Sequence, residues 1–138
     1  MTTLEAVRDY LRRIPGLEAL SLDDLQDGHG DACLRPVPAD PVLRTYLDGS
    51  TRRQERFDLW IRRGSRGGET ARAADLQEMS DLADLLGKNS RRGILPVLGP
   101  GKKSLSLRAE TTAAPEILQE NGLLVDQITL LLDYFMEG

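Results

Sequence analysis

The sequence contains one cysteine, Cys33, and one histidine, His29, among its 138 residues. A single cysteine excludes a disulfide within the chain, and the two residues together are too few for a zinc site. This usage favours a reducing compartment such as the cytosol. The sequence also lacks the run of about 18–20 apolar residues that a membrane-spanning helix needs. Its first residues do not have the pattern of a signal or transit peptide, so we expect neither secretion nor a membrane partner.

Residues suited to catalysis are equally scarce. His29 and Cys33 are four positions apart, but a lone cysteine is more often a small buried apolar residue than a nucleophile. Residues 99–104 (Gly-Pro-Gly-Lys-Lys-Ser) look like the end of a phosphate loop. The motif needs glycine where Pro96 stands and serine or threonine where Lys103 stands, so a turn leading into a strand is expected. We predict no enzyme activity, no metal site and no cofactor.

Length and composition indicate one ordinary domain over residues 1–138. The hydrophobic residues make up 40% of the chain, and 13 glycines add to them. Together they come near the roughly 45–50% that is typical of globular domains when glycine is counted. A chain of this length can bury a core without help from metals or disulfides.

Charge is unevenly distributed along the chain. The net charge is −4, with 18 basic and 22 acidic residues. Residues 1–51 carry 5 basic and 9 acidic side chains, residues 52–103 carry 12 and 7, and residues 104–138 carry 1 and 6. A basic middle between acidic ends indicates either complementary contacts between copies of the chain or solvated charged faces.

Two amphipathic helices are predicted. The first begins with Thr2 and Glu5 at capping-box spacing and ends at Pro15-Gly16. The second begins at Thr70 as N-cap, reaches about Leu86, and ends at Gly87 or Asn89. Apolar residues at helical spacing form their buried stripes, namely Leu4, Val7, Leu11 and Ile14 in the first and Leu76, Met79, Leu82, Ala83 and Leu86 in the second. Acidic residues at steps of three, Asp75, Glu78, Asp81 and Asp84, indicate a solvated helix face or an interface.

Four strands are predicted from alternating or β-branched segments. They cover residues 32–37, about 53–63, a segment in which Leu105, Leu107 and Ala109 alternate with polar residues, and 122–137. Pro36 and Pro38 would place the first of these strands at a sheet edge or end it. The last segment has the spacing of a helix as well, but its β-branched and aromatic residues favour a strand. We therefore expect an α+β fold, a small antiparallel four-stranded sheet with two helices packed on one face, in the order α-β-β-α-β-β.

An arginine-rich strand is the main candidate for an interaction surface. Arg56, Trp60 and Arg62 alternate with core positions such as Phe57, so the tryptophan lies on the charged face. Nucleic-acid binding would call for aromatic platforms beside the basic residues, and the chain has only six aromatics. A protein contact is therefore the favoured interpretation, with simple solvation as the alternative. The predicted interface residues are Arg52, Arg53, Trp60, Arg62, Arg63 and Arg66.

Two loops, residues 40–51 and 64–69, are the other predicted contact elements. Polar or glycine-rich loops in a compact domain are often functional. The residues singled out in them are Tyr46, Asp48, Gly49, Ser50, Gly67 and Gly68.

With these residues in view, the chain resembles the tail terminator family of tailed bacteriophages, often labelled minor capsid protein. The family pattern runs from a proline through Tyr-x-Asp-Gly-Ser-x-x-Arg to a strand that bears phenylalanine. Here it is Pro41-Val-Leu-Arg-Thr-Tyr46-Leu-Asp48-Gly49-Ser50-Thr-Arg-Arg53-Gln-Glu-Arg-Phe57. A later Gly-x-Leu-Pro-x-Leu pattern is matched by residues 93–98. The likeness spans most of the chain, which departs from the family in its Arg- and Gly-rich segment 62–68 and its few aromatics.

The resemblance implies a structural protein of the virion, assembled in the cytoplasm of a bacterial host. Such proteins form a ring, commonly of six copies, that caps the head-proximal end of the tail tube and stops its elongation. The partners implied are other copies of the chain, the tail-tube protein and the head–tail connector, with DNA passing through the ring without sequence-specific binding. A head-side connector or stopper protein, or a small cytosolic binding or regulatory domain, are the alternatives. If the arginines contact a neighbour, charge reversal at Arg62 and Arg63 is expected to abolish assembly without unfolding the protein.

Overall fold

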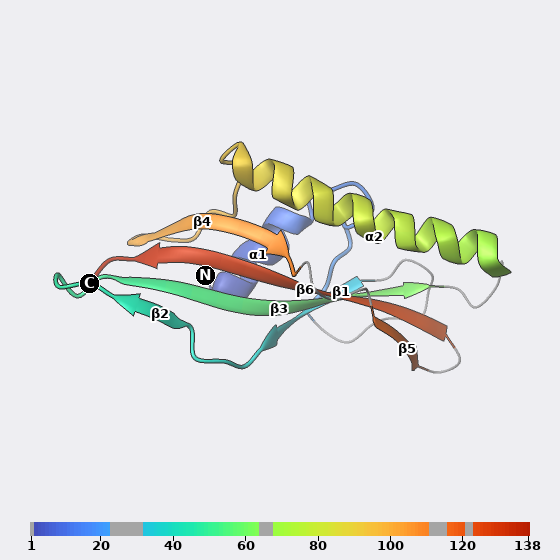
Figure 1. The fold of residues 1–138 in the computed structure, drawn as a ribbon, viewed down its shortest axis with the longest axis horizontal. Coiled ribbons are helices and arrows are strands. Elements are labelled where there is room, and N and C mark those ends of the chain that lie inside the picture. The colour runs from blue at the N-terminus through green and yellow to red at the C-terminus, as the bar shows by residue number, and fades with distance from the viewer. Residues whose placement is uncertain (1, 23–31, 64–67, 111–115, 121–122) are drawn as a thin grey trace.

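The computed structural model describes residues 2–22, 32–63, 68–110, 116–120 and 123–138. In chain order, its elements are α1 (Thr3–Leu11), β1 (Ala32–Val37), β2 (Val42–Thr45), β3 (Thr51–Arg63), α2 (Gly68–Arg91), β4 (Lys102–Ala109), β5 (Glu116–Glu120) and β6 (Leu123–Met136) (Figure 1). The predicted α+β class is confirmed, and the final segment is a strand and not a helix.

All strands belong to one antiparallel sheet, whose main path is β1-β3-β6-β4. These are the four predicted strands, and β1 lies at an edge as its prolines indicate. Two short strands were not predicted, since β2 pairs with β3 and β5 pairs with β6. The whole of β3 pairs with β6, from Thr51 opposite Met136 to Arg63 opposite Leu124. This long central pair joins the basic middle of the sequence to its acidic end.

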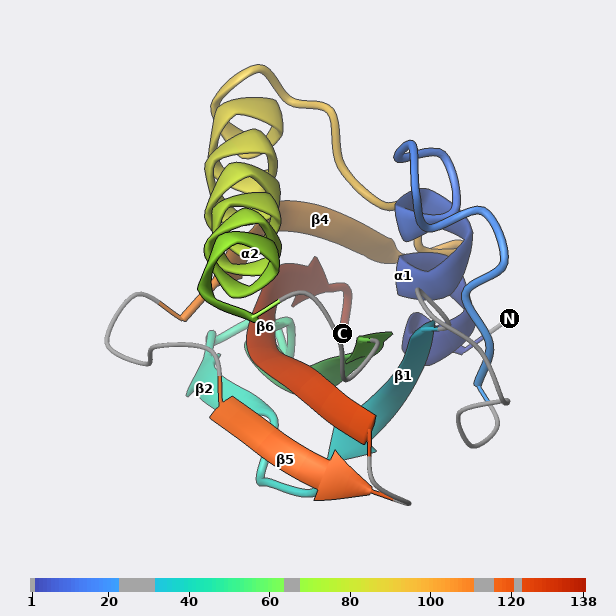
Figure 2. The same cartoon turned by 90° about the vertical axis from the view of Figure 1, so that its right-hand side faces the viewer.

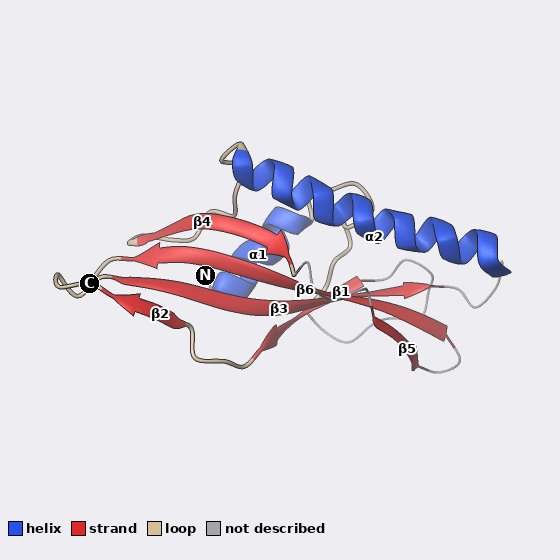
Figure 3. Ribbon diagram, in the orientation of Figure 1, coloured by secondary structure: helices blue, strands red, loops and turns tan. Residues whose placement is uncertain are grey.

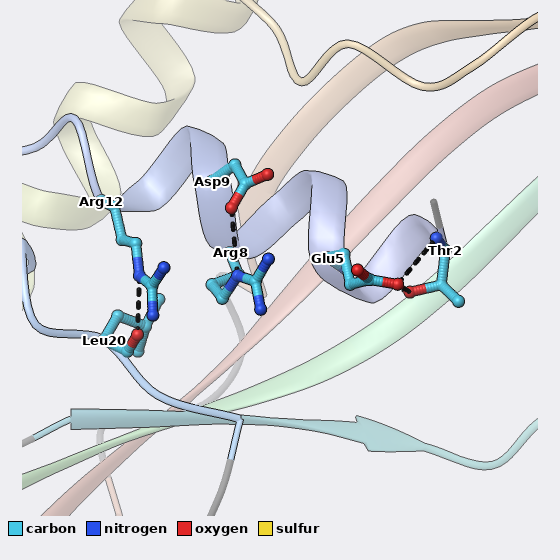
Figure 4. A network of polar contacts seen from close by, with 6 residues as sticks. All are labelled: Thr2, Glu5, Arg8, Asp9, Arg12 and Leu20. Atoms are coloured by element: carbon cyan, nitrogen blue, oxygen red, sulfur yellow. Dashed lines mark hydrogen bonds and ion pairs between the residues drawn. The ribbon is translucent and has the colours of Figure 1, made fainter.

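The first helix is fixed by its cap. The Thr2 hydroxyl accepts a hydrogen bond from the Glu5 amide at 3.1 Å, and the Thr2 amide donates to the Glu5 carboxylate at 3.2 Å (Figure 4). The Thr2 amide and, at 3.1 Å, the Thr2 hydroxyl both donate to the Glu5 carboxylate, and these two bonds lower the pKa of Glu5. The helix ends at Leu11, earlier than predicted, because the amides of Arg13 and Ile14 bond three residues back and tighten the chain into a turn before Pro15.

The second helix is longer than predicted at both ends. It starts at Gly68, so Thr70 lies inside the helix and not at its N-cap, and it continues past Gly87 and Asn89 to Arg91. A glycine inside a helix costs only about 1 kcal/mol. Tertiary contacts outweigh that cost here, since the Ser90 hydroxyl donates to the Leu107 carbonyl at 2.7 Å and accepts from the Leu107 amide at 3.0 Å.

Both helices lie on the same side of the central β3–β6 pair, as Figures 2 and 3 show. Their buried faces and one face of the sheet form a single core. It includes Val7 and Leu11 of α1, Met79, Leu82 and Leu86 of α2, Phe57, Leu59 and Ile61 of β3, and Leu130 and Leu132 of β6. Leu76, predicted to belong to the buried stripe, is 40% exposed.

In β4 the expected alternation is interrupted by a bulge. The register with β6 shifts between Ser104 and Ser106, which leaves Leu105 without a paired position and exposes it. Leu107 and Ala109, beyond the bulge, are buried as predicted. The strand follows the turn at residues 99–101, so the segment that resembled a phosphate loop is a turn into a strand.

Candidate interaction surface

The alternation of β3 separates the predicted interface arginines onto two faces. Arg52, Trp60 and Arg62 lie on the face opposite the helices, here called the helix-free face, together with Arg56. Arg53 occupies an alternate position, on the side of the helices, and Arg63 ends β3 opposite Leu124. The structure therefore does not bring the six predicted residues into one patch. Arg66 and Gly67 lie outside the described residues.

Two arginines of the helix-free face, Arg52 and Arg56, are paired within the chain. An Arg52 guanidinium nitrogen lies 3.6 Å from a carboxylate oxygen of Asp133, and one of Arg56 lies 3.1 Å from Glu110. Asp133 is almost fully buried, and its carboxylate also accepts a hydrogen bond from the side-chain amide of Gln54 at 2.8 Å. Basic residues from the middle of the sequence thus pair with acidic residues from its end within one molecule.

Trp60 and Arg62 are not exposed in the way that the predicted interface requires. The guanidinium of Arg35 lies over the Trp60 ring, 4.3 Å from its centre, which is a cation–π contact. Arg62 is only 2% exposed. The prediction that charge reversal at Arg62 would spare the fold is therefore wrong in its premise, because a reversed charge at a buried position destabilises the folded state.

The predicted loop at residues 40–51 is a β-hairpin. Val42 and Thr45 mark the ends of β2, which pairs with the start of β3. In the turn, the Tyr46 amide donates to the Ser50 carbonyl at 2.9 Å and the Gly49 amide donates to the Tyr46 carbonyl at 3.0 Å. Gly49 has φ of +87°, a conformation that side chains other than glycine rarely adopt.

Asp48 holds this turn together. Its carboxylate accepts hydrogen bonds from the Ser50 hydroxyl at 2.5 Å and from the Ser50 amide at 2.9 Å. These two bonds lower the pKa of Asp48, so the carboxylate stays charged and bonded at neutral pH. The four residues singled out in the sequence, Tyr46, Asp48, Gly49 and Ser50, are brought together as one ordered turn.

Apolar side chains at the end of this hairpin are exposed, and sequence reasoning missed them. Leu47 is 110% exposed and Leu43 is 54% exposed. We call five exposed residues of this element the hairpin tip, namely Val42, Leu43, Arg44, Tyr46 and Leu47. The sequence does contain a signal for the hairpin, because an Asp-Gly pair such as Asp48-Gly49 between two extended segments is typical of one.

Ring contacts hold the aromatic base of the hairpin tip. The Arg44 guanidinium lies 5.5 Å from the centre of the Tyr46 ring, and the Tyr46 ring lies 6.3 Å from that of Phe135 in β6. Gly138 lies directly against Gly49, since a Cβ added at Gly138 would come within 2.5 Å of the Gly49 carbonyl carbon. The hairpin tip is therefore an ordered protrusion anchored to the sheet.

A second surface feature is a hollow between the turn that follows α1 and the middle of α2, here called the α1–α2 groove. Its volume is about 480 Å³. Leu17, Met79 and Leu82 contribute apolar surface, and the carboxylate residues Glu78 and Asp81 also line it. The acidic series of α2 is thus divided, since Asp75 lies 3.8 Å from Arg72 and away from this lining.

Buried polar groups elsewhere in the described residues join elements of the fold. Asp126, fully buried, accepts a hydrogen bond from Arg72 of α2 at 2.5 Å. The Tyr134 hydroxyl donates to the Glu55 carboxylate at 2.7 Å. Burial and, second, this carboxylate raise the pKa of Tyr134 to about 12, so its hydroxyl stays protonated at neutral pH.

The residues considered for nucleophilic catalysis are not brought together in the described part of the chain. Cys33 is fully buried in β1, opposite Trp60 of β3, and His29 lies outside the described residues. Among the described residues, no group of three His, Cys, Asp or Glu side chains is placed to hold a metal ion.

No protein-family model matches the chain, and no curated protein matches it either. In the ranges that the structure covers, neither helix is long and apolar enough to cross a membrane.

Proposed function

We propose that the chain is a structural subunit of a phage or phage-like virion. Copies of it form a ring, commonly of six, that caps the head-proximal end of the tail tube. The ring stops tube elongation and offers a surface to the head connector. DNA passes through the ring without being read.

The hairpin carries this proposal. The segment that resembles tail terminators, from Pro41 to Phe57, folds into an ordered protrusion whose turn is held by Asp48 and Ser50. Leu47 is wholly exposed on this ordered turn, and Leu43 and Val42 of the same hairpin are exposed as well. Exposed apolar residues on a preformed element are typical of protein–protein contacts.

A closed ring also needs two different surfaces on each copy, because each contact in it is head-to-tail. The described residues offer a protruding apolar element, the hairpin tip, and a concave one, the α1–α2 groove. They lie on different parts of the molecule, because the hairpin turn is at one end of the long axis and the groove lies against the middle of α2 (Figure 1). This asymmetry suits a subunit of a ring.

The test is electron microscopy of tail tubes mixed with gold-labelled protein. The tubes are assembled from the tail-tube protein encoded in the same genome. Val97→Cys supplies the labelling site, because Val97 is exposed and the native Cys33 is fully buried. Gold at one end of each tube is the expected result. Gold along the tubes, or none, contradicts the terminator role and returns weight to a connector protein or a binding domain.

A further inference from the structure

The α1–α2 groove has the size and the charge of a docking site for an apolar and basic element. Its volume of about 480 Å³ is several times the roughly 150 Å³ that accommodates a benzene-sized group. Room is therefore available for two or three side chains. Among the described lining residues the only charged ones are Glu78 and Asp81, so the groove favours a cation beside the apolar group.

The hairpin tip has the complementary chemistry. Leu43 and Leu47 supply apolar side chains, and Arg44 supplies a positive charge between them. The turn is already ordered by its backbone hydrogen bonds and by Asp48, so docking does not require the loss of much further conformational entropy.

A second hollow on the surface fits the hairpin tip less well. It lies between α1 and residues 95–99 and has a volume of about 310 Å³. Its lining contains both Asp9 and Arg13. One charge of each sign gives no net attraction for Arg44, so charge complementarity selects the α1–α2 groove.

We propose that the hairpin tip of one copy docks into the α1–α2 groove of a second copy. This inference rests on the proposed ring and specifies its contact. Leu47 enters the apolar part of the groove, and Arg44 approaches the carboxylates of Glu78 and Asp81. Because the tip and the groove are different surfaces, each copy gives one contact and receives one, which is how a closed ring propagates.

Two variants test the contact from its two sides. Leu47→Asp removes the apolar side chain of the tip, and the double variant Glu78→Lys, Asp81→Lys reverses the charge of the groove. Each is expected to weaken self-association about 10- to 100-fold, measured by sedimentation. Leu105→Asp and Arg92→Glu are the matched controls, since both residues are exposed and lie outside the tip and the groove. Both controls are expected to associate like the unchanged chain.

Mixing the two defective variants gives the sharper result. The tip variant retains an intact groove and the groove variant retains an intact tip. An equimolar mixture should therefore form one contact and stop at a dimer. Adding Arg44→Glu to the groove variant should restore larger assemblies by swapping the charges. The proposal is overturned if the tip variant or the groove variant assembles like the unchanged chain. It is also overturned if their mixture stays monomeric while the unchanged chain assembles.

Cysteine trapping covers the case of a weak contact. A Leu47→Cys chain is mixed with a Leu85→Cys chain, because Leu85 lines the groove and the native Cys33 is buried. Oxidation is expected to give a cross-linked heterodimer, whereas a Leu105→Cys chain in place of the tip variant gives none. A chain that stays monomeric at about 1 mM and gives no specific cross-link also overturns the proposal.

Failure of the docking and failure of the terminator role are distinguishable. If Leu47→Asp chains label one end of tail tubes like the unchanged chain, the docking is wrong and the capping role stands. If the unchanged chain never labels tubes but its self-association depends on Leu47 and Glu78, the docking stands and the capping role is wrong.

Discussion

Three charged side chains on the helix-free face have partners within the chain, whereas apolar side chains at the hairpin tip extend into solvent. Arg52 and Arg56 lie within ion-pair distance of Asp133 and Glu110, and the Thr129 hydroxyl donates to Asp58. Leu47, by contrast, is wholly exposed on an ordered turn. A dense block of charge in a sequence is thus no guide to an interface when another strand can neutralise it.

This contrast separates stability from assembly. Changes among the paired charges of β3, β6 and α2 are expected to lower the free energy of unfolding. Changes at the hairpin tip are expected to lower self-association and leave the free energy of unfolding almost unchanged.

The largest effect is expected for Asp126→Ala. It removes the buried carboxylate that Arg72 contacts most closely and leaves that guanidinium, among the described residues, only Asp75, at 3.8 Å. Breaking a buried ion pair costs about 3 kcal/mol or more. Chemical denaturation measures the loss. Asp84→Ala, at an exposed position of α2, is the control. An Asp126→Ala chain as stable as the unchanged one would mean that the pair contributes nothing.

Asp133→Ala is expected to cost about 2 kcal/mol. The substitution leaves the Gln54 amide without the acceptor that it has at 2.8 Å, and an unsatisfied polar group in a largely buried site costs about 1–3 kcal/mol. The same variant should still associate, which sedimentation checks at a temperature where it remains folded. Loss of association in the folded variant would place the helix-free face in the interface.

Gly49→Ala tests whether the order of the hairpin turn matters. With φ of +87°, alanine at this position is strained by about 1–2 kcal/mol. We expect a lower melting temperature in calorimetry and weaker self-association as well, because the tip loses its preformed shape. Gly99→Ala, where an added Cβ meets nothing within 4 Å and φ is not positive, is the matched control.

Alkaline pH should weaken the fold through Tyr134. Its pKa is raised to about 12 in the folded chain, above the value of about 10 in an unfolded chain. The folded state therefore holds this proton more tightly, and the associated stability is complete below pH 10 and is lost as pH rises toward 12. Urea denaturation between pH 9 and about 11.5 measures the slope. Tyr134→Phe should cost about 1 kcal/mol at neutral pH and show a shallower slope.

The smallest effect on stability is expected for Leu47→Asp. An exposed side chain with no contacts to lose changes the free energy of unfolding by no more than about 0.5 kcal/mol. Thermal denaturation of the monomer checks this value beside the association measurement. A large loss of stability would show that Leu47 supports the fold of its own chain, and the contrast between the two regions would fail.

Local spacing was sufficient for most elements. The capping box at Thr2 and Glu5 and the alternation around Phe57 predicted α1 and β3, and both are present. Boundaries were less accurate, as with the predicted helix end at Gly87, which lies inside α2 because packing against β4 outweighs the preference of glycine. The strand β2 was missed because all four of its residues are exposed and no apolar alternation marks it.

The candidate site was predicted in part. Tyr46, Asp48, Gly49 and Ser50 were predicted as contact residues of a loop, and the structure brings them together in one hairpin turn. The exposed leucine between them, Leu47, was not predicted. The arginines were grouped by their nearness in sequence, which the alternation of β3 divides between two faces. Arg62 was predicted to be a surface contact and is buried.

What the sequence determined by itself is the set of local structures, because caps, turns and periodicities depend on residues only a few positions apart. Only the tertiary structure decided which charges are neutralised and which apolar groups remain exposed. That outcome depends on the pairing of β3 with β6, which joins residues such as Gln54 and Asp133 across most of the chain. Such pairing is fixed by strand register and burial together, and the local spacing of residues does not contain it.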